Sequence, residues 1–187
     1  MSTFFDDFLN LGARDLGGLR LIVFSGVSGS GKTTAMRFLA ESHSGFRGRP
    51  VLELDCQPDL RSAPQVTGHL ILCDEVTQVR QLAGLARLMR NRNTVAVAAH
   101  LPLAMFRPYG FFGSAQYFRT DRGAEKIARY LDRSRLSYSR ATVAAYCKLY
   151  GANYVDLHHM LERFPNKNFD RTFAQFQKFC RMIRTAS

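Results

Sequence analysis

The sequence has few of the features that mark secreted, membrane-spanning or metal-stabilised chains. Its four cysteines are widely scattered, and no pair has the close spacing of a zinc site or a redox motif. Free thiols suit a reducing compartment, so we expect a cytoplasmic protein. Asp6 and Asp7 lie where a secretory signal would carry positive charge. Because no apolar run approaches the ~20 residues that cross a bilayer, we expect a soluble chain that is not transmembrane.

Glycine and proline occur in ordinary numbers, 14 and 6, which excludes collagen-like repeats and argues against disorder. There is no internal repeat and no low-complexity tract. The chain has 187 residues, of which 46% are hydrophobic. This is enough for one compact domain, or for a core with a small appendage.

Acidic residues are scarce in the last third of the chain. Residues 119–187 contain 14 Lys and Arg but only 6 Asp and Glu, whereas residues 1–118 contain 12 and 9. The basic segment is therefore the better candidate for binding an acidic partner, either a protein or a nucleic acid. A solvated, arginine-rich helical surface is the alternative interpretation.

Apolar runs and helical patterns alternate through the first two thirds of the sequence. Strands are predicted at 19–25, 51–55, 69–73, 94–99 and 115–118, and amphipathic helices at 32–42 and 79–89. Short turns between them favour an α/β fold with a mainly parallel sheet. From residue 120 the pattern is helical, so we predict a core at 1–119 and a basic helical segment at 120–187.

A glycine-rich loop lies between the first predicted strand and the first predicted helix. Its residues match G-x-x-x-x-G-K-[ST] in full, and Thr34 comes next in the helix: Gly26, Val27, Ser28, Gly29, Ser30, Gly31, Lys32 and Thr33. In such a turn the backbone N–H groups point inward and the helix adds its positive end, which together cradle a chain of phosphates. Lys32 would reach the β- and γ-phosphates and Thr33 would hold Mg²⁺. ATP is the expected nucleotide.

Two carboxylates come directly after a run of apolar residues at 70–73. In a parallel sheet, a strand that ends in Asp74 and Glu75 delivers both to the edge where ligands bind. Asp74 would anchor Mg²⁺ through water, and Glu75 would orient and polarise the attacking water. The alternative is that they only cap the next helix. We favour the functional interpretation because the phosphate loop lies upstream on what we expect to be a neighbouring strand.

His100 ends the strand TVAVAA at 94–99. A parallel sheet places it at the same edge, facing the γ-phosphate, where it would sense the nucleotide. An ordinary polar loop residue is the alternative.

These motifs resemble the P-loop NTPases that have an additional strand between the phosphate-loop strand and the strand ending in the acidic pair. VLELD at 51–55 is the candidate for that strand. The run from Leu70 to His100 is similar to the ABC-type ATPases, with an acidic pair, a helix, a strand and a switch histidine. The resemblance covers about residues 19–100. It implies a three-layer α/β sandwich, a homo-oligomer, and a weak match of Gln57 to the family's Mg²⁺-contacting glutamine.

The sequence also departs from the ABC-type pattern. It has no LSGGQ-like signature, and only 40 residues lie between Thr33 and Asp74, too few for the helical subdomain of that family. The family's head-to-tail dimer depends on that signature. No arginine finger is identified, although Arg90 and Arg92 are available.

Three functions are open at this stage. The favoured one is a Mg²⁺-dependent ATPase that acts as a switch or motor on a partner, because the acidic pair and His100 favour water as acceptor. The alternative is a small-molecule kinase with its acceptor site at Phe46–Arg49 or Arg107–Arg122. The third is a module that binds ATP without turning it over.

The C-terminal helices allow two further interpretations. The spacing around Gly151 loosely resembles a helix–turn–helix, but Asp156 and Glu162 on the second helix would repel phosphates, so plain helical packing is favoured. His158 and His159 suggest a metal, yet no partner ligands lie at usable spacing. The stripe of phenylalanines from Phe169 to Phe179 is predicted to be core.

Overall fold

The computed structural model describes residues 7–55, 59–120 and 123–186, with the backbone alone at 184–186. These residues form two compact units. The first contains the residues up to Gly26 and those from Gly31 to Thr120. The second contains the residues after Thr120 and also Val27–Ser30, the middle of the glycine-rich loop. Each unit is described by itself.

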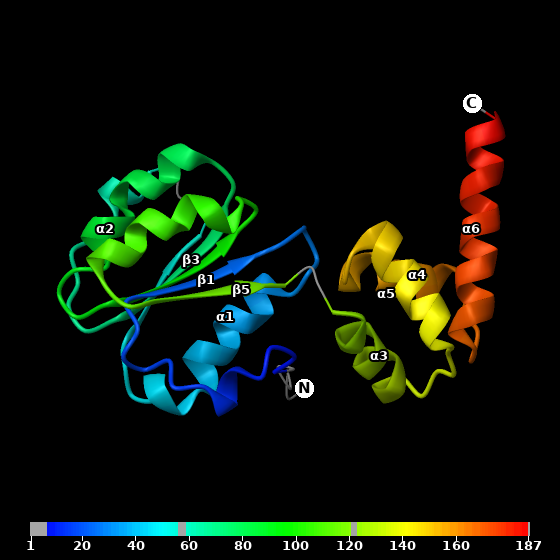
Figure 1. The fold of residues 1–187 in the computed structure, drawn as a ribbon, viewed down its shortest axis with the longest axis horizontal. Coiled ribbons are helices and arrows are strands. Elements are labelled where there is room, and N and C mark those ends of the chain that lie inside the picture. Colours follow the sequence, from blue (N-terminus) through cyan, green and yellow to red (C-terminus); the bar gives the residue numbers. More distant parts are fainter. Residues whose placement is uncertain (1–6, 56–58, 121–122, 187) are drawn as a thin grey trace. The chain divides into compact units, whose positions relative to one another are not determined.

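A five-stranded sheet forms the centre of the first unit, in the order β2-β3-β4-β1-β5 (Figure 1). Every neighbouring pair is parallel. The strands are β1 (Leu21–Ser25), β2 (Val51–Leu54), β3 (Leu70–Val76), β4 (Thr94–Ala99) and β5 (Ala115–Arg119). The predicted mainly parallel sheet is therefore confirmed for the described residues.

Successive residues along each central strand point to opposite faces of the sheet and so belong to two separate hydrophobic cores. Val23, Cys73 and Val97 face one side and pack with apolar residues of the segments at 79–89 and 103–112. Phe24, Leu72 and their neighbours face the other side and pack against α1 (Lys32–Glu41). Figure 1 shows α1 on one face of the sheet and α2 (Leu85–Leu88) on the other. Both faces are covered, which is why the central strands read as continuous apolar runs.

The expected position of VLELD was wrong. β2, which holds four of its residues, lies at the edge of the sheet, and β4 is the strand between β1 and β3. One additional strand does lie between the strand before the glycine-rich loop and the strand with the acidic pair, but it is β4 and not VLELD. Burial explains the order: every residue of β4 is buried, whereas Val51 is 42% exposed and Glu53 is exposed. A glutamate is tolerated at an edge but not at the centre of a sheet covered on both faces.

Several predicted helices are tighter or shorter than expected. The segment predicted as one helix at 79–89 is a 3₁₀ helix, η4 (Val79–Gly84), followed by the single turn α2. The aperiodic segment before β5 contains another 3₁₀ helix, η5 (Leu103–Phe112). The described residues of this unit also contain three short 3₁₀ turns, η1 (Leu11–Ala13), η2 (Ser44–Phe46) and η3 (Leu60–Ser62).

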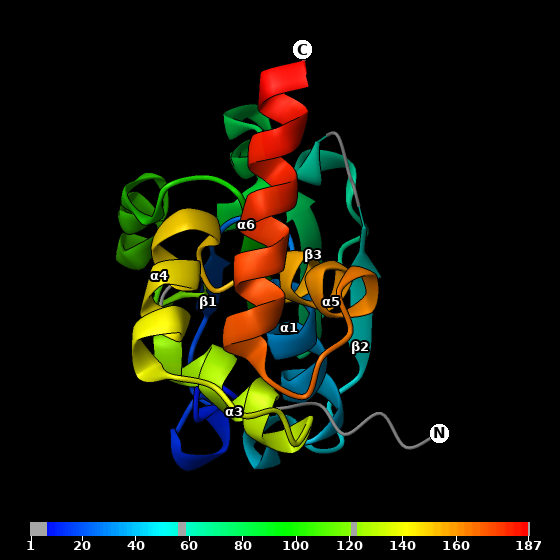
Figure 2. The ribbon, with the colours of Figure 1, turned by 90° about the vertical axis from the view of Figure 1, so that its right-hand side faces the viewer.

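The second unit is helical and has its own core. Its helices are α3 (Ala124–Arg133), α4 (Arg140–Tyr150), α5 (Tyr154–Arg163) and α6 (Phe169–Ala186). Tyr146, Leu157, Met160 and Phe169 are fully buried between them. Figure 2 shows α6 extending past the other three helices toward the C-terminus. Among the described residues, no helix combines the length and apolarity needed to cross a membrane.

Close backbone packing at Gly84 gives a test of the first unit. A Cβ there would lie 2.3 Å from the carbonyl carbon of Leu60 in η3. We expect Gly84→Ala to lower the free energy of unfolding by about 1–3 kcal/mol, because the obstacle is backbone and has to move. Gly18 has no heavy atom within 4 Å of the same position. Gly18→Ala is the control, and urea denaturation should place it within about 0.5 kcal/mol of the parent chain. Equal effects of the two substitutions would contradict this packing.

Candidate functional site

The glycine-rich loop connects β1 to α1 and requires glycine at two positions. Gly29 and Gly31 have φ of +71° and +88°, a region that side chains disfavour. Gly31 precedes the first residue of α1, and it has no side chain that could cap the first N–H groups of the helix. Those amides are the groups that a helix leaves for an anion. The local structure therefore has the turn and the helix start that the motif predicts.

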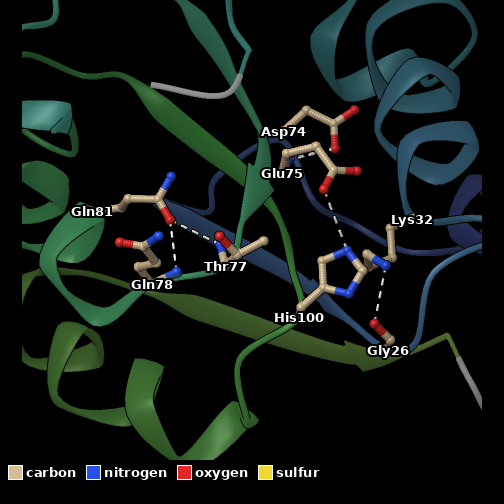
Figure 3. A network of polar contacts seen from close by, with 8 residues as sticks. All are labelled: Gly26, Lys32, Asp74, Glu75, Thr77, Gln78, Gln81 and His100. Atoms are coloured by element: carbon tan, nitrogen blue, oxygen red, sulfur yellow. Dashed lines mark hydrogen bonds and ion pairs between the residues drawn. The ribbon is translucent and has the colours of Figure 1, made fainter. Parts of the chain in front are cut away.

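The side chain of Lys32 reaches back to Gly26, the first residue of the glycine-rich loop. Its Nζ donates to the carbonyl oxygen of Gly26 at 3.0 Å, and the residue is only 6% exposed (Figure 3). The N–H of Gly26 in turn donates to the carbonyl oxygen of Ala99 at the end of β4, at 3.2 Å. The ammonium group is thus held at the carboxyl edge of the sheet, where an anion bound by the loop amides would meet it.

The acidic pair lies in a bulge of β3. Cys73 and Val76 pair with Val97 and Ala99, so two residues of β3, Asp74 and Glu75, stand opposite one residue of β4. Bulges of this kind turn side chains away from the regular alternation. The bulge also takes Glu75 to φ +54°, an uncommon conformation for a residue with a side chain. Such strain is concentrated at functional sites, and sequence reasoning had no signal for it.

Glu75 and His100 meet at the ends of adjacent strands. Oε2 of Glu75 lies 3.5 Å from Nε2 of His100, and the two side chains point toward each other (Figure 3). The backbone N–H of His100 donates to Val76 at 3.0 Å, which fixes the histidine beside the bulge. The Glu75 and His100 side chains are 48% and 27% exposed, so both reach solvent. The parallel pairing of β3 and β4 brings together two residues that the sequence analysis selected separately.

Helix capping does not account for the acidic pair. The side-chain oxygen of Gln81 accepts the N–H groups of Thr77 and Gln78 at 2.8 and 2.7 Å, so a buried glutamine organises the start of η4 (Figure 3). Asp74 instead accepts the N–H of Glu75 at 2.8 Å, a bond inside the bulge. The carboxylates are held at the sheet edge without serving the next helix.

Thr33 and Asp74 line the same small pocket, whose volume is about 80 Å³. This is several times the roughly 10–15 Å³ that one water molecule needs. The described residues contain no group of three or more His, Cys, Asp and Glu side chains placed to hold a metal. Mg²⁺ does not require one, since it is commonly held by one or two protein oxygens, water and substrate phosphates. A hydroxyl and a carboxylate on one pocket fit that kind of ion.

Cys73 directly precedes the acidic pair and is chemically quiet. Burial, together with a smaller effect of the Asp74 charge in the same direction, raises the pKa of its thiol to about 12. A thiol with that pKa is protonated at neutral pH and is not a nucleophile. Cys73 is therefore a core residue of β3, and catalysis through it is excluded.

The middle of the loop belongs to the helical unit. The N–H of Tyr154, the first residue of α5, donates to the carbonyl oxygen of Gly29 at 2.9 Å. The buried Lys126 of α3 donates from Nζ to the carbonyl oxygen of Ser30. A Cβ on Gly29 would lie 2.2 Å from Oδ1 of Asn153, so this glycine is required by packing as well as by its φ. Val27 and Ser28 form the exposed tip of the loop.

Sequence reasoning missed Lys126 as a residue of this site, although a signal was present. A lysine in the first turn of a helix faces the positive end of the helix dipole, which is unfavourable. Such a residue needs a compensating partner. Only the fold could show that this partner is a carbonyl group of the glycine-rich loop.

Other residues selected from the sequence lie elsewhere. Arg90 and Arg92 precede β4, and Arg49 precedes β2, so they lie toward the amino edge of the sheet, opposite the loop. Arg49 donates to Gly17 at 2.9 Å and to Thr94 at 3.0 Å, which is a structural role. Gln57 and Arg122 fall outside the described residues.

The pair of histidines on α5 is not part of a metal site in the described residues. His158 lies 3.0 Å from Glu162 one turn further along the helix and 3.4 Å from the hydroxyl of Tyr130. The start of α5, which a helix–turn–helix would present to bases, is bonded to Gly29 instead. This arrangement favours the packing interpretation of the helices over DNA reading.

Comparison of the chain with protein-family models found no match, and comparison with curated proteins found no similar sequence. Function is therefore inferred from the geometry of the site alone.

The strain at Glu75 can be tested without any ligand. We expect Glu75→Gly to leave the free energy of unfolding unchanged or to raise it by up to about 1 kcal/mol, because glycine adopts φ +54° without strain. The control is Glu53→Gly in β2, which should lower it by about 0.5–1 kcal/mol. Urea denaturation of both variants decides the matter. A larger loss at Glu75 than at Glu53 would show that the left-handed conformation is not strained.

Proposed function

We propose that this protein binds ATP with Mg²⁺ in the loop Gly26–Thr33 and hydrolyses it. The observation that carries the proposal is the placement of Glu75. Its backbone is strained, the bulge of β3 turns its side chain out of the regular alternation, and its carboxylate pairs with His100. It lies at the same carboxyl edge of a parallel sheet as the phosphate-binding turn and Lys32. In open α/β sheets this edge is where ligands bind.

Each residue has a role that its position supports. The loop amides and the start of α1 hold the phosphates, and Lys32 neutralises charge on them. Thr33 and Asp74, which line one pocket, would hold Mg²⁺, and the ion would offset charge on the β- and γ-phosphate oxygens. Thr34 lies next in the first turn of α1 and adds a further amide.

Glu75 is the residue proposed to act on the water. Its carboxylate accepts a proton from a water molecule as that water attacks the γ-phosphorus and the bond to the β-phosphate oxygen breaks. His100 stays within reach of Glu75 and would report whether the γ-phosphate is present. The products are ADP and inorganic phosphate.

The small-molecule kinase remains a proposal of lower rank. One of its two acceptor segments, Phe46–Arg49, precedes β2 and so lies away from the carboxyl edge, and Arg49 is engaged by Gly17 and Thr94. The other segment, Arg107–Arg122, includes Arg119, which pairs with Ser25 in the register of β5 and β1 and so ends at the correct edge.

The helical unit is proposed to bind an acidic partner, either a nucleic acid or a protein, on which ATP hydrolysis acts as a switch or motor. Its exposed basic residues are distributed over all four helices and their connections: Arg129, Arg133, Arg135, Arg140, Lys148, Arg163, Lys167, Arg171, Lys178 and Arg181.

Replacing Glu75 tests the ATPase directly. We expect the parent chain to release phosphate steadily from Mg·ATP with no added metabolite, and chelation of Mg²⁺ by EDTA to stop it. Glu75→Gln should slow phosphate release by about 10²- to 10⁴-fold, because it removes a general base, while the Kd for ATP changes little. Glu41→Gln, at an exposed glutamate in the last turn of α1, is the matched control. Unchanged turnover in the Glu75 variant removes its catalytic role, and turnover only with an added hydroxyl compound favours the kinase.

Salt dependence identifies the class of partner. If the basic helices bind nucleic acid, the affinity for a labelled oligonucleotide should fall steeply between 50 and 200 mM salt, about 10³-fold or more if six or more phosphates are neutralised. Fluorescence anisotropy measures it. Absence of binding even at low salt would rule out nucleic acid and leave an acidic protein as the proposed partner.

A further inference from the structure

Lys126 is a buried cation at an unfavourable place in its own helix. It is 4% exposed and lies in the first turn of α3, where the helix dipole opposes a positive charge. Burying a lysine also removes its hydration. Two contacts within the helical unit compensate for this: Nζ donates to the carbonyl oxygen of Ser30 and lies 4.4 Å from the centre of the Tyr154 ring.

The adjacent carbonyl of the loop is held as well. Gly29 accepts the N–H of Tyr154 at 2.9 Å. Asn153 places that N–H by capping α5, because its Oδ1 accepts from Val155 at 2.9 Å and from Asp156 at 3.3 Å. Two successive carbonyl groups of the phosphate loop are thus bound by donors from α3 and α5.

Holding a carbonyl also fixes the direction of an amide. In a trans peptide the C=O and the next N–H point to opposite sides, and the described chain has no cis peptide. The N–H that shares a peptide with the Gly29 carbonyl, that of Ser30, donates to Val27 at 3.3 Å and closes the turn. The N–H that shares a peptide with the Ser30 carbonyl is that of Gly31, and it must point away from Lys126.

Glycines alone cannot provide this orientation. Gly29 and Gly31 flank the two peptides, and glycine permits both signs of φ with little difference in energy. Without an external anchor the peptide between Ser30 and Gly31 is therefore free to turn over. An ammonium group on the Ser30 carbonyl favours one of the two orientations strongly, since hydrogen bonds from charged donors are about twice as strong as neutral ones.

We propose that Lys126 is a positioning residue for the triphosphate: it fixes the Ser30–Gly31 peptide so that the Gly31 N–H is presented to the phosphates. The inference rests on the proposed function, since it assumes that the loop binds a nucleotide. In this proposal Lys126 acts through the Ser30 carbonyl group and not through contact with the nucleotide. Its charge and the positive end of α5 also raise the potential around the loop, which favours an anion in it.

Three variants of one residue test this inference. Lys126→Met keeps the aliphatic contact with Tyr154 but removes the donor, Lys126→Gln keeps a neutral donor, and Lys126→Arg keeps a charged one. We expect Lys126→Met to weaken Mg·ATP binding by about 10- to 100-fold, the range of one charged hydrogen bond. Lys126→Gln should fall between Met and the parent, and Lys126→Arg should restore most of the affinity. Fluorescence titration with a labelled ATP measures all three.

Two controls separate positioning from general damage. Arg61→Met removes an exposed cation of η3, outside the proposed nucleotide and partner sites, and should change the Kd by less than about twofold. Ile127→Val removes a methyl group from the fully buried neighbour of Lys126 and should lower stability without changing the Kd. Denaturation curves accompany each titration. Equal Kd values for the parent chain and Lys126→Met, or equal losses in Lys126→Met and Ile127→Val, would overturn the proposal.

A second readout does not need a nucleotide. NMR relaxation in the nucleotide-free protein should show greater motion of the Gly31 amide in Lys126→Met than in the parent or in Arg61→Met, because the peptide loses its anchor. If the parent binds no ATP, the proposed function fails, yet unchanged motion of the Gly31 amide still refutes the anchor and greater motion still supports it. The two failures are therefore distinguishable.

Discussion

Parallel pairing of β1, β3 and β4 is the constraint on which the candidate site depends. All three strands run in the same direction, so their carboxyl ends lie at one edge of the sheet. The glycine-rich turn comes after β1, the carboxylates come with the last residues of β3, and His100 comes after β4. Segments far apart in the chain therefore meet, and reversing any one of the strands would send its residue to the opposite edge. Every residue of β4 is buried, and this burial stabilises the pairing of β4 with β1 and β3.

Backbone strain and the acidic pair of the candidate site coincide at the bulge of β3. A regular strand would alternate Asp74 and Glu75 between the two faces of the sheet, where helices cover both. The extra residue releases both carboxylates from that alternation, and the left-handed conformation of Glu75 is the local cost. The chain tolerates the strain because regular pairing resumes at Val76 and because Asp74 binds the freed N–H of Glu75.

Much of this arrangement could be predicted from the sequence, and the failures have physical causes. Strands and the helix after the loop were predicted because apolar periodicity and glycine placement are local signals. The order of the strands was wrong at VLELD, since adjacency in the sequence says little about adjacency in a sheet with crossovers. The bulge could not be predicted from the residue types, because glutamate is a common residue and here adopts an uncommon backbone conformation. Lys126 was missed for a third reason: its partner, Ser30, is 96 positions away.

The four residues from Val27 to Ser30 are joined along the chain to residues of the first unit but pack with the second unit. The backbone joins them to the sheet on both sides, while their contacts place them with the helices. A molecule that binds α3 or α5 and moves either helix would therefore also move the loop peptides that are proposed to hold phosphates. Thermodynamic linkage makes this coupling mutual. If a ligand in the loop raises the affinity of α3 and α5 for a partner by some factor, the partner raises the affinity of the loop for the ligand by the same factor. In the proposed function, a partner bound to α3 or α5 would therefore change the affinity of the loop for nucleotide without contacting the nucleotide.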